Sequence, residues 1–416
     1  MPIRILPILF VLAFIAAGLL IPAPPTNTGS DRVKIVSSLP RSGSAKGQTD
    51  TIVDGIRLAI DEAGGEVTIK KTGKAYKIEY QDLDDATAAA GQWTAEQETN
   101  NANLARLDPD VMVYIGTYNS GAAKISMPIL NRAHVLMVSP ANTATGLTKP
   151  NEGERDEPKR YRPSGEVNYV RVVPTDDLQG RAGAEWAQFM GVNKVYILDD
   201  NEVYGKGVAD LFEGHARKIG LEILGRESID AKAQEFGALM TKIKRKDPDM
   251  IYFGGTTQTK AGQVAKDLVK VGMKNCKMMA PDGCYEEAMI KSAGADVLEG
   301  RFFVTFGGLT PDRLTATAGG KKFVEQYEKK FGKKPSEAYA LYGYECARVA
   351  IEAIRQADSK DRDAVRRAGI ALKDFPGITG VWSFDKNGDT TLQEMSGITV
   401  KNGKFEFAKN LEVKQK

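Results

Sequence analysis

VYIGTYNSGAAKISMPILNRAHVLMVSPANT, residues 113–143, contains two short apolar runs separated by a stretch long enough for a helix. The runs at residues 111–115 and 135–138 are rich in β-branched side chains, which is typical of neighbouring parallel strands buried on both faces. A polar turn follows each run. Both turns are expected at the same carboxyl edge of the sheet, where open α/β sheets bind their ligands.

The polar turns of this stretch predict a receptor for a small carboxylate. Ser120 stands where the intervening helix begins, and Thr143 ends the second turn. Backbone N–H groups at a helix N-terminus have no intrahelical partner, and the positive end of the helix dipole attracts an anion.

The composition is that of an ordinary soluble globular protein with two lobes. The chain has 416 residues, of which 42% are hydrophobic and 27% charged. This length exceeds what a single hydrophobic core usually supports. The net charge of +3 and the lack of a basic block with interleaved aromatic residues argue against a nucleic-acid partner.

Residues 1–30 read as an export segment that is separate from the fold. Arg4 precedes an apolar run at residues 5–21, followed by a spacer that contains Pro and Thr. The run is close to the minimum length of a membrane-spanning helix, so the segment is either a cleaved signal peptide or a retained N-terminal anchor. We therefore expect a periplasmic protein that is either free or membrane-tethered.

The cysteines and histidines predict neither a metal site nor a cofactor. Cys276 and Cys284 form a disulfide if their Cα atoms approach closely enough, and otherwise all three cysteines, with Cys346, are small core residues. Only His134 and His215 are present, and neither lies in a cluster of Cys or His.

Strand-like and helical patterns alternate along most of the chain, which predicts an α/β fold with two doubly wound lobes. The first unit combines the opening stretch with strands at residues 33–37 and 76–80 and helices at residues 49–63 and 86–107. The second repeats the arrangement, with strands at 195–198, 222–224, 250–253 and 277–280 and helices at 179–190, 203–219, 236–244 and 258–271. Two similar lobes with open edges imply a cleft between them.

The C-terminal third predicts a hinge of three chain crossings. A strand at 301–306 precedes helices at 318–331, 335–357 and 362–372, and residues 381–384 and 394–400 are expected to form a hairpin through Asn387 and Gly388. Crossings near residues 172, 305 and 380 would place residues 31–172 and 306–379 in lobe 1 and residues 173–305 and 380–416 in lobe 2. Several crossings let rigid lobes rotate about a few residues.

The segment at residues 147–166 is dense in charge, Pro and Gly. This composition is typical of a solvated loop. Because the segment follows Thr143 directly, a lid or partner-docking loop at the mouth of the cleft is the alternative.

A set of short motifs occurs in a recognisable order. They are SSLPRSGSAKGQ (37–48), DGIRLAIDEAGG (54–65), VYIGTYNSG (113–121), VSPANT (138–143), RVVPTDDLQG (171–180), ILDDNEVYGKG (197–207), FGG (253–255), PDG (281–283) and FDKNGD (384–389). In this order, behind an export segment, they resemble the periplasmic branched-chain amino-acid-binding proteins of ABC transporters. The resemblance runs from Val33 to about Phe407.

The resemblance implies a type I periplasmic-binding fold that closes on a solute and delivers it to a membrane permease. It places Ser120, with main-chain N–H groups of the following turn at Gly121, on the ligand carboxylate. Thr143 and the carbonyl of Ala141 would hold the ammonium and carboxylate. Asp282 would pair with the ammonium, and Tyr204 would close over the ligand from the second lobe. We expect a monomer.

Each of these residues also has a purely structural interpretation. Ser120 and Thr143 are ordinary helix-capping or turn residues, Asp282 suits a Pro-Asp-Gly turn, and Tyr204 could pack on the surface.

Four further positions depart from the leucine-binding pattern by being polar: Lys46, Tyr118, Asn119 and Thr256. If Lys46 faces the cleft, a second anionic group on the ligand would pair with it; solvent exposure is the alternative. The ligand class therefore stays open among branched-chain or polar amino acids, related carboxylates, and amide or urea-like solutes.

Competing functions are weaker. The chain has no G-x-G-x-x-G motif after the first strand, no P-loop and no G-x-S-x-G elbow, so we do not expect an enzyme. A ligand-sensing or regulatory protein with the same fold is the alternative to a transport function.

Overall fold

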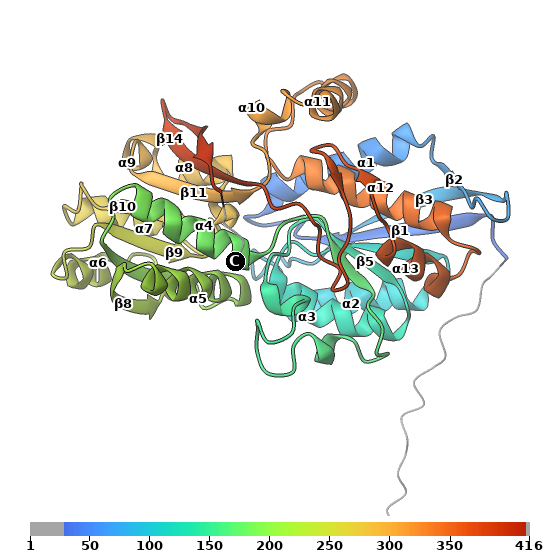
Figure 1. Cartoon of the computed structure of the whole chain (residues 1–416), viewed down its shortest axis with the longest axis horizontal. Helices are drawn as coiled ribbons and strands as arrows, with labels where there is room; N and C mark the ends of the chain where they lie inside the picture. The colour runs from blue at the N-terminus through green and yellow to red at the C-terminus, as the bar shows by residue number, and fades with distance from the viewer. Residues whose placement is uncertain (1–28, 413–416) are drawn as a thin grey trace, which may run out of the picture.

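Two β-sheets lie side by side in the computed structural model, which describes residues 29–412 (Figure 1). The predicted N-terminal signal or anchor lies almost entirely outside the described residues. The first lobe is built on a six-stranded sheet with the order β2-β3-β1-β4-β5-β6, and the second on a seven-stranded sheet with the order β15-β14-β11-β10-β9-β7-β8. The architecture confirms the predicted α/β fold with two doubly wound lobes.

Buried parallel strands form the centre of the first lobe. Every residue of β4 and β5 is buried, as their runs of β-branched and other apolar side chains predict. The strands are β1 (Arg32–Leu39), β2 (Glu66–Thr68), β3 (Ala75–Asp84), β4 (Val111–Gly116), β5 (Leu136–Ser139) and β6 (Tyr169–Arg171). The helices that cover them are α1 (Lys46–Glu62), α2 (Ala95–Leu107), α3 (Ser120–Arg132), α12 (Ala340–Gln356) and α13 (Arg362–Ile370).

The second lobe repeats the strand order of the first. Its run β8-β7-β9-β10-β11 corresponds to β3-β1-β4-β5-β6, and each of these neighbouring pairs is parallel. The strands are β7 (Lys194–Asp199), β8 (Glu222–Ser228), β9 (Met250–Gly254), β10 (Lys277–Ala280), β11 (Phe302–Gly307), β14 (Met395–Lys401) and β15 (Lys404–Asn410). The helices are α4 (Asp176–Phe189), α5 (Val203–Lys218), α6 (Gly237–Lys244), α7 (Ala261–Lys270), α8 (Glu287–Ala293) and α9 (Ala295–Leu298).

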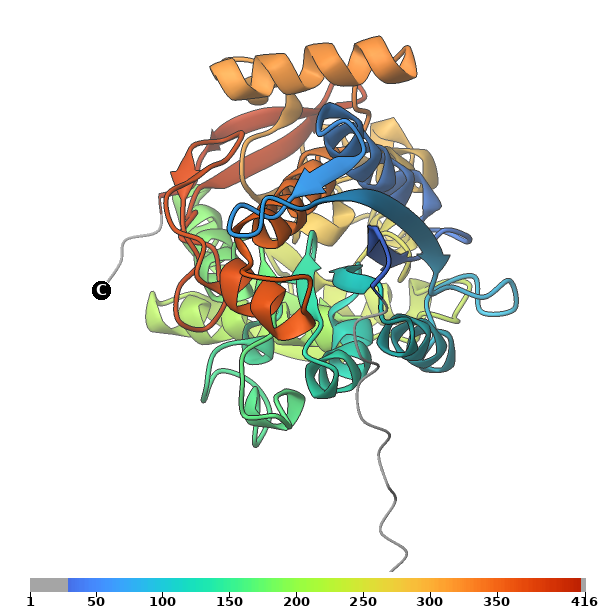
Figure 2. The same ribbon diagram turned by 90° about the vertical axis from the view of Figure 1, so that its right-hand side faces the viewer.

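The C-terminal helices return to the first lobe. The short helix α10 (Pro311–Leu314) is followed by α11 (Ala318–Phe331), which lies across the top of this lobe in Figure 2. Helix α12 packs closely on α1, because Gly55 and Gly343 carry no side chain at the contact. A Cβ at Gly55 would lie 2.2 Å from the carbonyl oxygen of Ala340, and one at Gly343 would lie 2.1 Å from that of Ile52. These helices have no sheet of their own and cover an existing one, as predicted.

The predicted C-terminal hairpin is wrong. Residues 381–384 do not pair with 394–400; instead β13 (Val381–Trp382) pairs with β12 (Phe375–Pro376), and β14 pairs with β15. Residues 387–388 do form a turn, but it closes only an isolated bridge between Phe384 and Thr390. Because Asp389 bridges to Arg171 at the end of β6, the third crossing lies between Asp389 and Met395 rather than near residue 380.

Helix α2 is shorter than predicted. It begins at Ala95 rather than near residue 86, because Thr94 adopts an extended backbone and its hydroxyl accepts a hydrogen bond from the Gln97 amide. The preceding residues 86–93 form a loop closed by a bridge between Ala86 and Trp93. This loop brings Trp93 toward the second lobe.

The cysteines form no disulfide, and the charged loop lies beside the second lobe. Cys276, Cys284 and Cys346 are all buried and unbridged. The loop at residues 147–166 is anchored by the buried side chains of Glu157 and Tyr161, which hydrogen-bond to each other, while most of its other residues are exposed. Several of its residues also line a hollow with Asp176 and α5 of the second lobe, so a lid at the mouth of the cleft stays a prediction beside the solvated loop.

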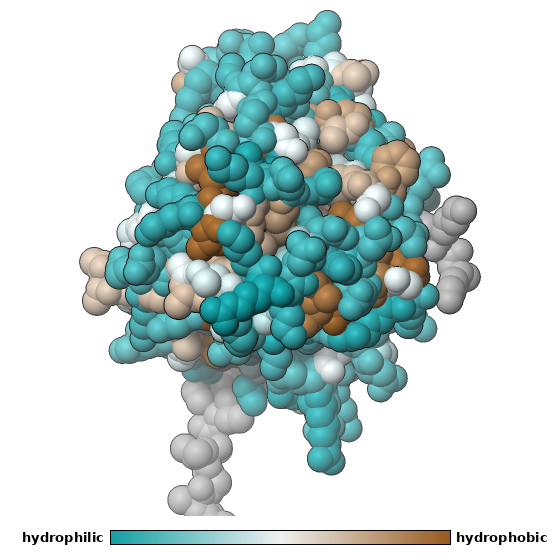
Figure 3. Space-filling view, turned by 90° about the vertical axis from the view of Figure 1, so that its left-hand side faces the viewer, coloured by the Kyte–Doolittle hydropathy of each residue, from teal (hydrophilic) through white to brown (hydrophobic). Residues whose placement is uncertain are grey.

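The outer end of the second lobe carries mainly hydrophilic residues, with hydrophobic ones in small separate groups (Figure 3). Among residues 29–412, none of the helices combines the length and the hydrophobicity that crossing a bilayer requires.

Candidate functional site

A cavity lies where the carboxyl edges of the two sheets meet. It is lined by Tyr118, Asn119, Ser120, Ala141, Tyr204, Thr256, Asp282, Gly283 and Tyr339. These residues follow β4, β5, β7, β9 and β10 or, for Tyr339, precede α12. Every predicted ligand residue except Lys46, Gly121 and Thr143 therefore lines one space.

The wall from the first lobe offers hydroxyl and amide donors. Ser120 opens α3 and is buried, and its hydroxyl accepts a hydrogen bond of 3.4 Å from the Ala144 amide. The first intrahelical hydrogen bond runs from Ala122 to Asn119, so the amides of Ser120 and Gly121 precede the helical ladder. The Thr143 hydroxyl lies behind this wall, buried, with no hydrogen-bond partner among residues 29–412. These groups are suited to a carboxylate.

Asp282 is the charged group that lines this cavity from the second lobe. Its carboxylate accepts hydrogen bonds from the hydroxyls of Tyr204 and Tyr339. Tyr204 belongs to the second lobe, whereas Tyr339 stands at the start of α12 in the first, so the Tyr339 bond joins the lobes. Burial raises the pKa of Asp282, and the hydrogen bonds from the two tyrosines act in the opposite direction.

Asp176 adds a second buried carboxylate beside Asp282. It begins α4 and has no exposed surface, and neither carboxylate oxygen meets a hydrogen-bond donor among residues 29–412. Burial, and then the charge of Asp282, raise its pKa well above the ordinary range; the nearby Thr143 hydroxyl acts the other way without completing a hydrogen bond. The charge of the buried Arg171 guanidinium also acts to lower this pKa, but neither Asp176 oxygen forms an ion pair with it.

A second interlobe cavity adjoins the first and shares Asn119, Tyr204 and Thr256 with it. The remaining lining residues are Pro40, Ala45, Gln92, Trp93, Asp200, Glu202, Gln258 and Thr259. The Trp93 ring rests on the start of α3, because Gly121 has no side chain there. A Cβ at Gly121 would lie 2.7 Å from Cζ2 of Trp93. Gly121 thus positions an aromatic wall in addition to offering an amide.

The four residues that depart from the leucine-binding pattern are divided between cleft and solvent. Tyr118 is buried and packs edge-on to Tyr339, and Thr256 and Asn119 line both cavities. Lys46, by contrast, points to solvent with 55% of its side chain exposed and pairs with Asp50 at 2.6 Å. The solvent-exposed alternative for Lys46 is the one the structure supports.

Four site residues escaped the sequence reasoning: Trp93, Asp176, Glu202 and Tyr339. Asp176 and Glu202 lie within motifs that were recognised, RVVPTDDLQG and ILDDNEVYGKG, and their positions next to expected helix starts were the available signal. Trp93 falls within the predicted helix at residues 86–107, which in the structure begins only at Ala95, and Tyr339 is one of several aromatic residues in a helical stretch.

Each cavity has a volume of about 20 Å³. A single water molecule needs roughly 10–15 Å³, whereas ligand pockets commonly measure roughly 300–1,000 Å³. A solute can therefore enter only when the lobes or their side chains move apart.

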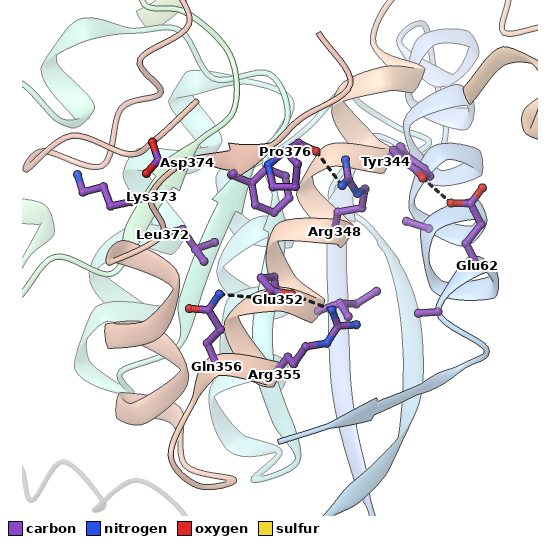
Figure 4. A pocket seen from close by; sticks show the side chains of 14 residues that line it. Glu62, Tyr344, Arg348, Glu352, Arg355, Gln356, Leu372, Lys373, Asp374 and Pro376 are labelled. Atoms are coloured by element: carbon purple, nitrogen blue, oxygen red, sulfur yellow. Dashed lines mark hydrogen bonds and ion pairs between the residues drawn. The ribbon is translucent and has the colours of Figure 1, made fainter. Parts of the chain in front are cut away.

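A larger hollow lies elsewhere, on the outer side of the first lobe between α1, α12 and residues 372–376 (Figure 4). It has a volume of about 390 Å³, but its polar groups already bind one another. Arg348 donates to the Pro376 carbonyl at 2.8 Å, and Arg355 and Gln356 both donate to Glu352. Because these polar groups already hydrogen-bond to one another, few donors and acceptors are left to recognise a small solute.

No cluster of three or more His, Cys, Asp or Glu side chains that could hold a metal ion occurs in the part of the chain that the structure describes.

Comparison with known proteins agrees with this geometry. Residues 32–404 match the periplasmic binding protein family. A Leu/Ile/Val-binding protein of Rhizobium johnstonii, BraC3, is 27% identical over 372 residues, which cover 88% of this chain and 91% of that protein.

Two solved structures share the fold over nearly their whole length. The leucine-binding protein LivK of Thermotoga maritima has a TM-score of 0.77 at 25% identity, covering 91% of this chain and 98% of that one. The branched-chain amino-acid transporter substrate-binding protein LivJ of Streptococcus pneumoniae, solved with isoleucine, has a TM-score of 0.74 at 26% identity, covering 91% and 99%.

Proposed function

The chain belongs to the periplasmic binding protein family, whose members are binding proteins rather than enzymes, and from this premise we propose that it binds a small amino acid or related carboxylate or amide for an ABC importer. It acts outside the cytoplasm, as the family implies, and hands its solute to a membrane permease. An N-terminal segment that is cleaved or retained as an anchor is part of the same proposal.

The observation that carries the proposal is that hydrogen-bond donors line one side of an interlobe cavity and a carboxylate lines the other. Ser120 and Ala141 face it from the first lobe and Asp282 from the second. A zwitterion buried between lobes needs hydrogen-bond donors for one end and a negative charge for the other, because an uncompensated buried charge costs several kcal/mol or more.

Ser120 and the amides that open α3 hold the carboxylate of the solute, and Thr143 supports this wall from behind. Donors at a helix start favour an anion through both their hydrogen bonds and the helix dipole. Asp282 and the Ala141 carbonyl accept from the ammonium, and Tyr204 covers the solute from the second lobe. Each lobe therefore holds one end of the solute.

Closure follows from this division. A solute that touches both walls binds the closed form better than the open form, and only such a difference in affinity can shift the equilibrium between them. The three crossings, after β6, after β11 and after Asp389, act as the hinge.

A thermal-shift screen of amino acids, small carboxylates and urea-type solutes tests the proposal, since a ligand of the folded state raises stability by mass action. We expect at least one amino acid to raise the midpoint, and calorimetry to show that Asp282→Asn weakens its binding by about 100-fold, the scale of a lost charge-assisted contact.

Asp31→Asn is the matched control, because Asp31 is exposed and remote from the cleft. Wild-type affinity in the Asp282 variant would show that the cleft is assigned wrongly. A screen without any response would contradict the amino-acid proposal itself.

A further inference from the structure

The interlobe cleft holds more carboxyl groups than one ammonium group can pair with. Besides Asp282, Asp200 and Glu202 line the second cavity, and Asp176 lies near Asp282 at the inner end of a neighbouring hollow that Lys124 and Lys206 also line. No Lys or Arg lines either cavity, and among residues 29–412 none forms an ion pair with these four carboxylates within 4 Å.

Asp176 is the most buried of these four carboxyl groups. It is fully buried, it lies close enough to Asp282 for the two charges to repel, and both its oxygens lack a hydrogen-bond donor. An ionised carboxylate in such a place requires a cation or a strong donor. An α-ammonium between Asp282 and Asp176 would supply one.

The second cavity has its own acidic and aromatic walls. Asp200 is satisfied by the Thr259 hydroxyl at 2.7 Å and by the Glu202 amide at 3.0 Å, so its charge is fixed within the second lobe. The Glu202 carboxylate is half-buried in the lining and pairs with no cation of the described chain. Across the cavity lies Trp93, held by Gly121.

An aromatic face opposite a carboxylate is a suitable site for a cation, which the ring quadrupole and the charge attract together. Gln92, Asn119 and Gln258 add amide oxygens that can accept further hydrogen bonds. An aliphatic side chain would leave these polar groups unpaired, and an anionic one would meet like charge.

We propose that the solute is a dibasic amino acid, whose second cationic group, a guanidinium or ammonium, binds between Trp93 and Glu202. This inference rests on the proposed function and specifies its ligand. The anionic side group that Lys46 would have favoured does not fit, because Lys46 pairs with Asp50 outside the cleft.

L-Arginine and L-citrulline form the decisive pair of probes, because they have nearly the same shape and differ in a charged guanidinium against a neutral ureido group. Calorimetry on the purified protein should show arginine binding at least about tenfold more tightly, the scale of one charge-assisted hydrogen bond. L-Lysine should exceed L-norleucine in the same way.

Glu202→Gln keeps the size of the side chain and removes its charge. In this variant the arginine-to-citrulline ratio should fall toward one, while Glu222→Gln, on the exposed start of β8, keeps the wild-type ratio. Trp93→Leu should also lower arginine affinity, and Trp93→Phe should restore part of it. Circular dichroism confirms that each variant is folded.

The possible outcomes distinguish failure of the dibasic-ligand inference from failure of the proposed amino-acid-binding function. Tight binding of leucine, citrulline or glutamate with no preference for cations overturns the dibasic ligand and leaves the amino-acid-binding function standing. An unchanged ratio in Glu202→Gln overturns the assigned position of the cation. If no amino acid binds at all, the proposed function fails with it.

Discussion

Arg171 donates a hydrogen bond from Nε to Oδ1 of Asp389 at 2.7 Å in the interior of the protein. The guanidinium has no exposed surface, and it also donates to the carbonyls of Asn142 and Ala144, the neighbours of Thr143. One ion pair thus joins the end of β6, the wall of the cleft and the segment that leads to the third crossing.

Asp389→Asn should destabilise the protein by about 3 kcal/mol, because removing one member of a buried pair leaves the other charge uncompensated. Urea denaturation at pH 7 measures the loss. Asp374→Asn, on an exposed residue of the same C-terminal region, should change the free energy of unfolding by less than about 0.5 kcal/mol. Equal stabilities for the two variants would show that the Arg171 pair contributes little.

Tyr339→Phe removes the interlobe hydroxyl from Asp282 while keeping the ring contacts with Tyr118 and Phe306. We expect the unliganded protein to lose about 1.5–3 kcal/mol, as for a hydrogen bond to a charged group. The solute should bind about threefold more tightly or better, because its ammonium no longer competes with a phenol.

Calorimetry and urea denaturation together test the Tyr339 prediction. Tyr342→Phe is the control, since that hydroxyl donates to the Gly307 carbonyl rather than to Asp282. It should lower stability without changing affinity. A tenfold loss of affinity in Tyr339→Phe would mean that this hydroxyl binds the solute directly.

Gly121→Ala should weaken solute binding by about tenfold. The new Cβ would come within 2.7 Å of the Trp93 ring, which must move, and overpacking of this kind costs roughly 1–3 kcal/mol. In Gly214→Ala, by contrast, the Cβ of the α5 residue meets nothing within 4 Å. That variant should gain roughly 0.5–1 kcal/mol of stability and keep its affinity. Parallel calorimetry and thermal unfolding measure both variants, and unchanged binding by Gly121→Ala would exclude Trp93 from the site.

The repeated strand–helix pattern predicted the fold because its buried strands are continuous apolar runs. The hairpin failed for a local reason: both Asn387-Gly388 and Asn402-Gly403 are good turn sequences. Only the second is followed by a strand with alternating character, KFEFAKN, which is intermediate and exposed in alternation along β15. Period-2 alternation beside the turn was the decisive signal.

The candidate site was predictable in part. Ser120, Tyr204 and Asp282 follow strands at sheet edges, so the fold alone brings them together. Trp93 and Tyr339 reach the cleft through a loop and a returning helix, whose placement depends on packing across lobes rather than on local sequence. Lys46 was misjudged as a cleft candidate because the orientation of a first-turn side chain depends on its partner, Asp50.

Stability should fall as the pH rises from about 5 to 8. Burial, and then the charge of Glu286, raise the pKa of Glu337 to about 8, and burial raises that of Glu286 to about 7. The folded protein therefore binds more protons than the unfolded chain above the ordinary glutamate pKa of about 4.3. The contribution of each group to the free energy of unfolding is fully present below about pH 4.3. It decreases as the pH rises toward the pKa of the folded state, by at most about 1.4 kcal/mol per pH unit for each group.

Glu337→Gln should flatten this pH profile, because the amide resembles the protonated carboxyl. Glu328→Gln, on the exposed face of α11, should leave the slope unchanged. Urea denaturation at pH 5, 6, 7 and 8 gives the slopes, and stability that rises over this range in the wild type would contradict the raised pKa values.

Because Tyr204 and Tyr339 already donate hydrogen bonds to Asp282, a solute that binds this carboxylate must replace existing hydrogen bonds. Its ammonium has to displace neutral phenols from a carboxylate that is already served. Weakly basic or poorly fitting amines gain almost no binding free energy from such a replacement. The site therefore selects against them through the ammonium group alone, independently of the solute's side chain.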